Sequence, residues 1–384
     1  MKTKTINFVT QLFAKRDIPY IYSNIYNKVS GEYIYENNIE IEPLEDVFIV
    51  EDLPRYLKIE EVEKPKNFHS YKFKQYPGFR IDFKDVKSLS GYLNERFGKS
   101  SRYKLRREQR KLEHCFDISY KMYYGEMPKD EYDFVFDEFY KLLEVRSIEK
   151  GITGNANLKY KDDYYRRVHN MILNKDASFF VIYNGKNPID ICLNFHVKNT
   201  IFQYIRTYDI AYSKFNTGYT DLMKQIEWCI ANNVDSISFS KGSYYWKQRW
   251  CNTVYDYDYE VFYNTKSIKA IFYATKFKMI KNLKQITREL GVIEKYHTWK
   301  EEKRKASLPE PTYKTEILES QELDFSTIEF IDFTKEEFSD LRRLIYEFLY
   351  ASDEREKDIK VYKDKVNKDT FFVLGSSNQA KITL

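Results

Sequence analysis

The sequence predicts a mixed α/β fold in which most strands pair with an antiparallel neighbour. Strand-like runs follow one another through short turns between residues 177 and 209, where Asn184 and Gly185 form a hairpin-type dipeptide. A helix at 220–233 and a further strand at 234–240 come next. Hairpins followed by one helix and another strand are typical of a mixed sheet and not of the regular strand–helix alternation of a parallel sheet.

Composition narrows the class of protein. The 384 residues are enough for two or three domains, and a hydrophobic fraction of 42% allows a substantial core. The 63 lysines and arginines nearly balance the 58 acidic residues, which argues against a general nucleic-acid binder. The 4 cysteines form no CxxC pair and the 5 histidines show no metal-ligand spacing. We therefore expect reduced thiols and no metal.

The start of the chain lacks the features of a secretion signal. Its apolar stretch is short and is not followed by a small-residue cleavage site. No run of 18 apolar residues occurs, so the sequence predicts no transmembrane helix. These observations favour a soluble cytoplasmic protein.

The first third of the chain changes character near Val86. Residues 1–85 are rich in strand-forming residues, and the stretch FKQYPGFRIDF (73–83) predicts a turn that leads into a strand. Residues 85–115 predict two helices, which are broken between Gly98 and Ser101, with Ser100 or Ser101 as the N-cap of the second. A strand is expected at 116–125.

Helical spacing of apolar residues predicts the next elements. A helix at 128–150 would bury Phe134, Phe139, Leu142 and Leu143 and end at the glycines that follow it. A second helix is expected at 161–176. After the hairpin strands, a strand at 256–265 precedes a basic helical segment at 266–306 and a Pro-containing linker at 308–316. The tail predicts a strand at 326–333, one or two helices at 335–366, and strands at 370–375 and 380–384.

Two segments carry unusual side chains. Residues 96–111 hold eight cations (Arg96, Lys99, Arg102, Lys104, Arg106, Arg107, Arg110 and Lys111). A helix this basic could contact nucleic-acid phosphates; it could also be a solvated face with Leu105 and Leu112 turned inward, or attract an anionic donor or a lipid-linked acceptor. The second segment, SFSKGSYYWKQRW (238–250), follows a strand and places cations beside aromatic residues. Such a segment could recognise a phosphate or carboxylate, or it could be a solvated turn whose aromatic residues complete the core.

Four segments of residues 86–250 resemble the GNAT acyltransferase superfamily, and specifically its CelD-like branch, which is related to the FemAB-like aminoacyl ligases. They are SSRYKLRREQRKLE, FDEFYKLLEVRSIEKG, TYDIAYSKFNTGYTDLMKQIEWCIANN and the segment at 238–250. In the last one Phe239, Gly242, Lys247, Arg249 and Trp250 match the pattern D-F-x-x-G-x-x-x-Y-K-x-R-W, whereas Ser238 replaces its Asp and Trp246 its Tyr. Thr217 stands where proline is usual, and the multi-glycine loop is reduced to Gly218.

The resemblance implies two GNAT-like lobes with a mostly antiparallel sheet flanked by helices. We expect an incomplete N-terminal lobe at 1–95, the main acyltransferase domain at 96–265, a basic helical segment and linker at 266–311, and a small α/β segment at 312–384. The tail is either a separate small domain or the completion of a neighbouring sheet.

The resemblance also assigns residues to roles. A helix N-terminus would hold the donor's pyrophosphate through the amides of Thr217, Gly218 and Tyr219, together with Lys247 and Arg249. Asp209 would accept the acceptor's proton through water and Tyr208 would protonate the leaving thiolate. Arg146, Trp246 and Trp250 would bind the acceptor. The lone histidines His169 and His196 are possible bases, but on apolar segments such residues are more often structural.

The implied activity is N-acyl transfer from acyl-CoA, such as acetyl-CoA, or an acyl carrier protein to an amino group. The acceptor would be a sugar, a glycan precursor or a small amine, and no metal would take part. One alternative is a FemAB-like ligase that takes an amino acid from aminoacyl-tRNA, with the basic helix on the RNA. Another is a catalytically inactive GNAT fold that serves as a binding module. The sequence leaves the oligomeric state open.

Overall fold

The computed structural model of the chain describes residues 1–36, 44–152, 154–306, 313–318 and 324–384. It divides into two compact units, each described here by itself. The first unit holds residues 1–92, 194–204 and 229–307, and the second holds residues 93–193, 205–228 and 308–384. The predicted linker at 308–316 begins outside the described residues. We keep the predicted domain boundaries at 95, 265 and 311 as a proposal.

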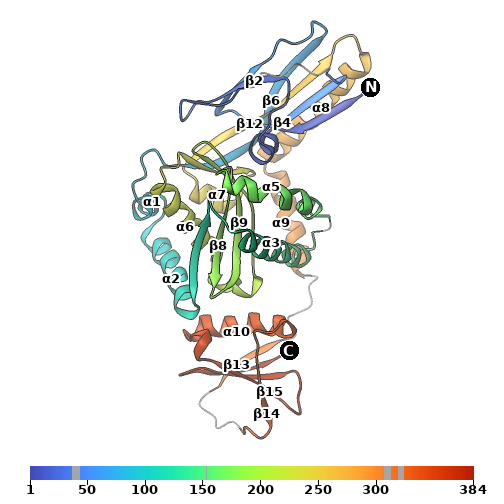
Figure 1. The fold of residues 1–384 in the computed structure, drawn as a ribbon. Coiled ribbons are helices and arrows are strands. Elements are labelled where there is room, and N and C mark those ends of the chain that lie inside the picture. The colour runs from blue at the N-terminus through green and yellow to red at the C-terminus, as the bar shows by residue number, and fades with distance from the viewer. Residues whose placement is uncertain (37–43, 153, 307–312, 319–323) are drawn as a thin grey trace. The chain divides into compact units, whose positions relative to one another are not determined.

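A large sheet forms the centre of the first unit (Figure 1). Its strands occur in the order β1, β4, β12, β6 and β11, and residues 200–204 of β10 follow next to β11. Strand β1 is parallel to β4, whereas β12 is antiparallel to both of its neighbours. The bounds are β1 Thr3–Asn7, β4 Val47–Pro54, β12 Thr253–Asn264, β6 Phe68–Asp82, β11 Ser236–Lys241 and β10 Thr200–Tyr208.

Smaller elements complete the first unit. A second sheet has the order β3 (Glu32–Glu36), β2 (Tyr22–Asn27), β5 (Leu57–Glu61), and a π-helical turn, η1, spans Thr10–Lys15. Helix α7 (Tyr245–Trp250) follows β11. Helices α8 (Ile268–Glu289) and α9 (Val292–Ala306) follow β12, which confirms the predicted basic helical segment.

The turn predicted within residues 73–83 is wrong, because β6 runs through it without interruption. A Cβ on Gly78 would lie 2.4 Å from the ring of Tyr255 and 2.7 Å from that of Tyr257. The glycine therefore serves close packing: two tyrosines of the neighbouring strand lie over a bare backbone.

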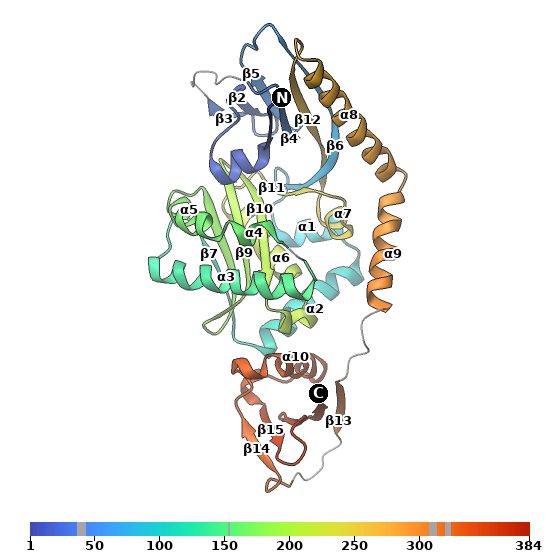
Figure 2. The ribbon, with the colours of Figure 1, turned by 90° about the vertical axis from the view of Figure 1, so that its right-hand side faces the viewer.

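The second unit contains the predicted hairpin strands, in the order β10, β9 (Asn187–Val197), β8 (Ala177–Asn184), β7 (Ile118–Tyr123). Strands β9 and β10 also contribute residues to the first unit. Gly185 turns between β8 and β9 with a φ of 57°, as its dipeptide predicts. Helices α3 (Lys129–Glu149) and α5 (Lys161–Leu173) contact each other beside these strands, and the short α4 (Ala156–Lys159) joins them (Figure 2).

Two helix details differ from prediction. Helix α2 (Lys99–Cys115) follows α1 (Leu89–Arg96), but its N-cap is Gly98 and not Ser100 or Ser101, so no side chain caps it. In α3 the side chain of Phe134 is 46% exposed, whereas the other three predicted residues, Phe139, Leu142 and Leu143, are buried as expected. Val135 and Phe136, the next two residues, point inward in place of Phe134.

The tail forms its own five-stranded antiparallel sheet with the order β13, β17, β16, β15, β14. Of the one or two helices predicted at 335–366, one α-helix forms, and residues 360–364 form β15 instead of continuing as helix. The predicted linker also ends early, since β13 begins at Lys314. The bounds are β13 Lys314–Leu318, β14 Ile328–Ile331, α10 Ser339–Ser352, β15 Lys360–Asp364, β16 Thr370–Leu374 and β17 Gln379–Thr383.

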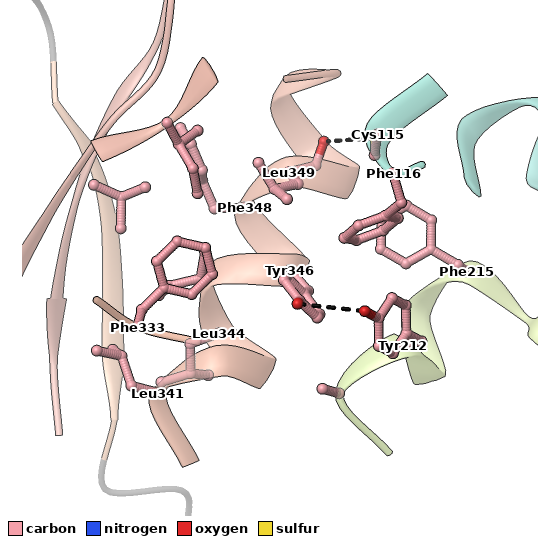
Figure 3. Packing of buried hydrophobic residues seen from close by; sticks show 14 of the residues in the cluster. Cys115, Phe116, Tyr212, Phe215, Phe333, Leu341, Leu344, Tyr346, Phe348 and Leu349 are labelled. Carbon is pink, nitrogen blue, oxygen red and sulfur yellow. Dashed lines mark hydrogen bonds between the residues drawn. The ribbon is translucent and has the colours of Figure 1, made fainter. Parts of the chain in front are cut away.

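Helix α10 joins this sheet to the rest of the second unit (Figure 3). Phe348 and Leu344 belong to the same buried cluster as Phe116 and Phe215. The Tyr346 ring lies 4.8 Å from the ring of Phe116, centroid to centroid. The tail is therefore a separate sheet with a shared apolar interface, and the chain has the mixed α+β architecture that the sequence predicts.

Candidate active site

Helix α6 (Thr217–Ala231) follows β10 after a short 3-10 helix. Between them, Asp209 caps the 3-10 helix η2 (Ile210–Phe215) by accepting a hydrogen bond from the Ala211 amide at 2.9 Å. Asn216 then adopts a left-handed conformation, with a φ of 52°, and directs the chain into α6. The short polar residues in this stretch thus set the position at which α6 begins.

Gly218 lies directly against the guanidinium group of Arg206 on β10. A Cβ at this position would be 2.8 Å from Arg206 Nη1, so a larger residue would displace the arginine. The Thr217 hydroxyl accepts from Arg206 Nη2 at 3.3 Å, and the Tyr219 amide donates to the Asn216 carbonyl at 2.9 Å. Of the three amides predicted to hold an anion, that of Tyr219 is therefore occupied within the turn.

Arg206 pairs with two buried carboxylates that the sequence analysis did not single out. Its Nη2 donates to Asp190 on β9, and its Nε lies 3.5 Å from Asp221 on α6. Asp190 is fully buried and Asp221 is 1% exposed. Gln225, one turn further along α6, donates to both oxygens of Asp221 at 3.1 and 3.0 Å. The cluster fixes β9, β10 and the start of α6 to one another.

The charges of this cluster do not balance when all three groups are ionised. Burial raises the pKa of Asp190, and Arg206 acts against that rise. Burial also raises the pKa of Asp221, helped by the negative charge of Asp190. Two carboxylates with one guanidinium favour the retention of one proton between them. The same carboxylates raise the pKa of Arg206, which stays charged.

Tyr208 lies between two arginines. Its ring centroid is 4.7 Å from the guanidinium carbon of Arg146 and 4.9 Å from that of Arg206. Arg146, near the end of α3, also pairs with Glu149. Burial lowers the pKa of Lys150, and the positive charges of Arg146 and Arg206 lower it further. The structure thus brings together three predicted residues, Arg146, Tyr208 and Gly218, in one corner around Arg206. Carboxylates pair with both guanidinium groups there: Glu149 with Arg146, and Asp190 and Asp221 with Arg206.

Asp209 is the candidate base. Burial raises the pKa of its carboxyl group, whereas the Ala211 amide and the charges of Arg342 and Lys141 lower it. A carboxylate with a raised pKa accepts a proton more readily than an ordinary one. Because Asp209 caps η2, its Oδ1 already accepts a hydrogen bond from the Ala211 amide.

The segment at 238–250 lies in the first unit and is tightly held. The Lys247 ammonium donates to the carbonyls of Phe239 at 2.6 Å and Lys241 at 3.0 Å, and burial lowers its pKa to about 8. Trp250 is 2% exposed, and its carbonyl accepts from Tyr92. Lys247 and Trp250 therefore hold the turn together.

Trp246, Arg249 and Ser238 complete this segment. The Trp246 ring meets that of Phe239 edge-on at 5.3 Å, and Arg249 lies over the Tyr245 ring at 5.5 Å. Ser238, which replaces the Asp of the family pattern, shares a hydrogen bond of 2.8 Å with Tyr255. Gly218 belongs to the second unit, so its predicted proximity to Lys247 and Arg249 stays a prediction.

One face of α2 lines a cavity of about 600 Å³ in the second unit. Its lining has four cations and no acidic residue, and consists of Asn94, Lys99, Arg102, Tyr103, Arg106, Gln109 and Arg110. The opposite face of α2 is buried through Leu105, Glu108 and Leu112. Glu108 is turned inward, where it accepts hydrogen bonds from Tyr350 of the α10 helix at 2.8 and 2.9 Å.

The two histidines considered as possible bases, His169 and His196, are held by the surrounding structure. Burial lowers the pKa of His196 to about 3, and the His169 ring nitrogen lies 2.9 Å from the Met127 carbonyl oxygen, consistent with structural roles. Over the residues that the structure describes, no group of three His, Cys, Asp or Glu side chains could hold a metal ion. Cys115, Cys192, Cys229 and Cys251 are buried, and none of them forms a disulfide in the described structure. Among the same residues no helix has the length and hydropathy to cross a bilayer.

Residues 99–248 match the family model of a GNAT acetyltransferase domain. This part of the chain, which holds both α2 and the corner at Gly218, is therefore similar to a GNAT acetyltransferase domain, and the match indicates a transferase. No curated protein matches the chain significantly.

Solved structures show more distant similarity. A protein of unknown function from Bacteroides thetaiotaomicron has 10% identity over 56% of this chain and 69% of its own, with a TM-score of 0.39. The protein FemX has 8% identity over 56% of this chain and 71% of its own, with a TM-score of 0.39. The PaiA N-acetyltransferase from Thermoplasma acidophilum, in complex with coenzyme A, has 12% identity over 30% of this chain and 74% of its own, with a TM-score of 0.26. At these TM-scores the likenesses by themselves decide neither fold nor function.

Proposed function

We propose that this protein is an N-acyltransferase. It would move an acyl group from acyl-CoA or an acyl carrier protein to an amino group of a sugar, a glycan precursor or a small amine. The observation that carries the proposal is the corner of Gly218, Arg206, Tyr208 and Arg146 at the start of α6, which lies inside the region that matches the GNAT acetyltransferase domain.

The donor's phosphates are assigned to the N-terminus of α6. Helix N-termini attract anions through free amides and the helix dipole. Thr217 and Gly218 supply the amides, with Tyr219 as the next residue of the turn, and the guanidinium group of Arg206 lies against Gly218. In the first unit, we assign Arg249 to the donor and Lys247 to the turn that carries it, because both carbonyl contacts of Lys247 are internal.

The chemical step follows from the groups at the end of β10. The neutral amine attacks the thioester carbonyl, a C–N bond forms and the C–S bond breaks. Asp209 accepts the proton that the nitrogen loses, through a water molecule, and its raised pKa favours this role. Tyr208 donates a proton to the departing thiolate. No covalent acyl-enzyme is needed.

The acceptor is assigned to Arg146, Trp246 and Trp250. Arg146 suits a carboxylate or phosphate on the acceptor, because its guanidinium presents paired donors. Trp246 offers an aromatic surface for a sugar ring, whereas Trp250, which is 2% exposed, belongs to the core.

The cavity on α2 favours a second candidate, a FemAB-like ligase that uses aminoacyl-tRNA. Four cations on one helix face suit a phosphate backbone, and their contribution to binding would fall steeply with salt. In that case Arg102, Arg106 and Arg110 would contact RNA and the corner at Gly218 would receive the aminoacyl end.

Thermal unfolding of the full chain separates these functions. Acetyl-CoA, longer acyl-CoAs and total tRNA are added in turn. A ligand at 100 times its dissociation constant adds about 2.7 kcal/mol of stability. A response to an acyl-CoA that is lost in Gly218→Ala supports N-acyl transfer. A response to tRNA alone, lost in an Arg102→Gln/Arg106→Gln variant, supports the ligase. Silence towards every ligand contradicts both and favours an inactive binding module.

A further inference from the structure

Helix α8 has two apolar faces. Ala270, Ala274 and Phe277 pack on the sheet of the first unit, where α8 lies along β12, β6 and β4 (Figure 1). A second set of apolar residues is exposed by 52–84% of each side chain: Ile268, Phe272, Met279, Leu283, Ile286 and Leu290 at the C-cap. We call this second set the α8 stripe.

The stripe residues lie on one side of α8, away from the sheet, with Thr275 and Lys276 between Phe272 and Met279. Each residue of an α-helix turns by about 100°, so the six positions fall within roughly 60° of one another. The residues that pack on the sheet lie on the opposite side of the helix, about 180° away. An exposed apolar row of this length marks an interaction surface in a folded protein.

Basic residues accompany the stripe. Between Ile268 and Glu289, α8 holds five lysines and one arginine against a single acidic residue, Glu289. Lys281 pairs with Glu51 at 3.4 Å. Lys269, Lys276 and Lys284 form no ion pair in the part of the chain that the structure describes. The surface is thus apolar along its centre and positively charged at its borders.

We propose that the α8 stripe binds the surface of an anionic phospholipid bilayer. An amphipathic helix with a bulky apolar face and flanking lysines lies in the interface, with its apolar side chains among the acyl chains and its ammonium groups at the lipid phosphates. The helix binds on the membrane and does not cross it.

A second copy of the chain fits the stripe less well. If Phe272, Met279 and Ile286 are placed at the d positions of a heptad, the a positions hold Lys276, Leu283 and Leu290, so a lysine interrupts the seam and only its C-terminal half is apolar. A helix pair needs apolar residues at both positions. A bilayer requires no such register, and its negative charge complements the lysines.

The test is sedimentation of the full chain with large vesicles of phosphatidylcholine, either alone or mixed with phosphatidylglycerol. The wild type is expected to sediment with the anionic vesicles. Phe272→Ser/Met279→Ser should lower the partition coefficient by at least about tenfold, because both side chains are removed from the acyl region. Each replacement of Lys269, Lys276 or Lys284 by Gln should lower it by roughly fivefold on anionic vesicles only.

A matched control carries Ile148→Ser/Val366→Ser, which removes two apolar side chains that are 79% and 88% exposed elsewhere. This control should sediment like the wild type, and circular dichroism should show that all variants are folded. The proposal is overturned if the wild type does not sediment, or if the α8 variant sediments as the wild type does. It is also overturned if light scattering shows a dimer that the α8 variant abolishes while neither protein binds vesicles.

Discussion

Replacement of Arg206 by Met tests whether the charge cluster at the start of α6 organises the candidate site. The change would leave Asp190 and Asp221, 0% and 1% exposed, without their cation. Removal of one partner from a buried ion pair costs about 3–5 kcal/mol. The lower end applies, because 23% of the Arg206 side chain is exposed. A loss of about 3 kcal/mol lowers the thermal midpoint by roughly 6–12 °C for a unit of this size.

The assay is thermal and urea unfolding followed by circular dichroism. Arg167→Met is the matched control, because Arg167 pairs with Asp163 on the surface of α5, 32% and 43% exposed, and such pairs contribute at most about 0.5 kcal/mol. A triple variant, Arg206→Met with Asp190→Asn and Asp221→Asn, should recover much of the loss. The reasoning is refuted if Arg206→Met is no less stable than Arg167→Met.

The pH dependence of this variant has a definite sign. A carboxyl group whose folded pKa is raised contributes stability that is present below its unfolded pKa and lost as the pH rises through the folded value. Both carboxyl groups have raised pKa values because of burial. The loss of unfolding free energy in Arg206→Met, relative to the wild type, should therefore grow as the pH rises from about 4 towards neutrality.

Three further predictions follow from single contacts. Gly218→Ala places a Cβ 2.8 Å from Arg206 Nη1, so acyl-CoA affinity measured by calorimetry should fall at least tenfold, whereas Gly98→Ala, with open space around its Cβ, should bind normally. Lys247 has a pKa of about 8, so the wild type should gain unfolding free energy relative to Lys247→Met as the pH rises from about 8 to about 10; a constant difference contradicts this. Ile345→Ala, at a fully buried site, should cost about 2–5 kcal/mol in urea unfolding, and Ile345→Val about 1.

Local signals predicted most of the elements. Hairpin chemistry at Gly185 and helical spacing in α3, α5 and α6 depend on neighbouring residues, so the sequence contains the information. The errors arise where tertiary packing decides. The Pro77–Gly78 pair looks like a turn, but the rings of Tyr255 and Tyr257 on another strand occupy the space that the glycine leaves.

The candidate site was predicted in part. The sequence pointed to Tyr208, Asp209, Gly218 and Arg146, and the structure places Arg146, Tyr208 and Gly218 around Arg206. Arg206 itself was missed, together with Asp190 and Asp221, because they come from three separate elements. A signal existed: a single charged residue interrupts each of the apolar runs PIDICLNF and FQYIRTY. Buried charges of this kind require partners.

The segment at 238–250 shows the converse. Its cations and aromatic residues suggest a ligand site, yet Lys247 binds two backbone carbonyls and Trp250 is in the core. Local composition does not distinguish a lysine that binds a ligand from one that closes a turn, because in both cases a lysine can stand next to aromatic residues in the sequence.

The central claim is that the start of α6 receives the anionic part of an acyl donor. Amide hydrogen exchange, measured by mass spectrometry with and without acetyl-CoA, reports on this segment directly. The account predicts slower exchange at residues 216–222, and no such change in Gly218→Ala. Slower exchange confined to other segments, or an unchanged pattern at a saturating concentration of every acyl-CoA offered, would contradict it.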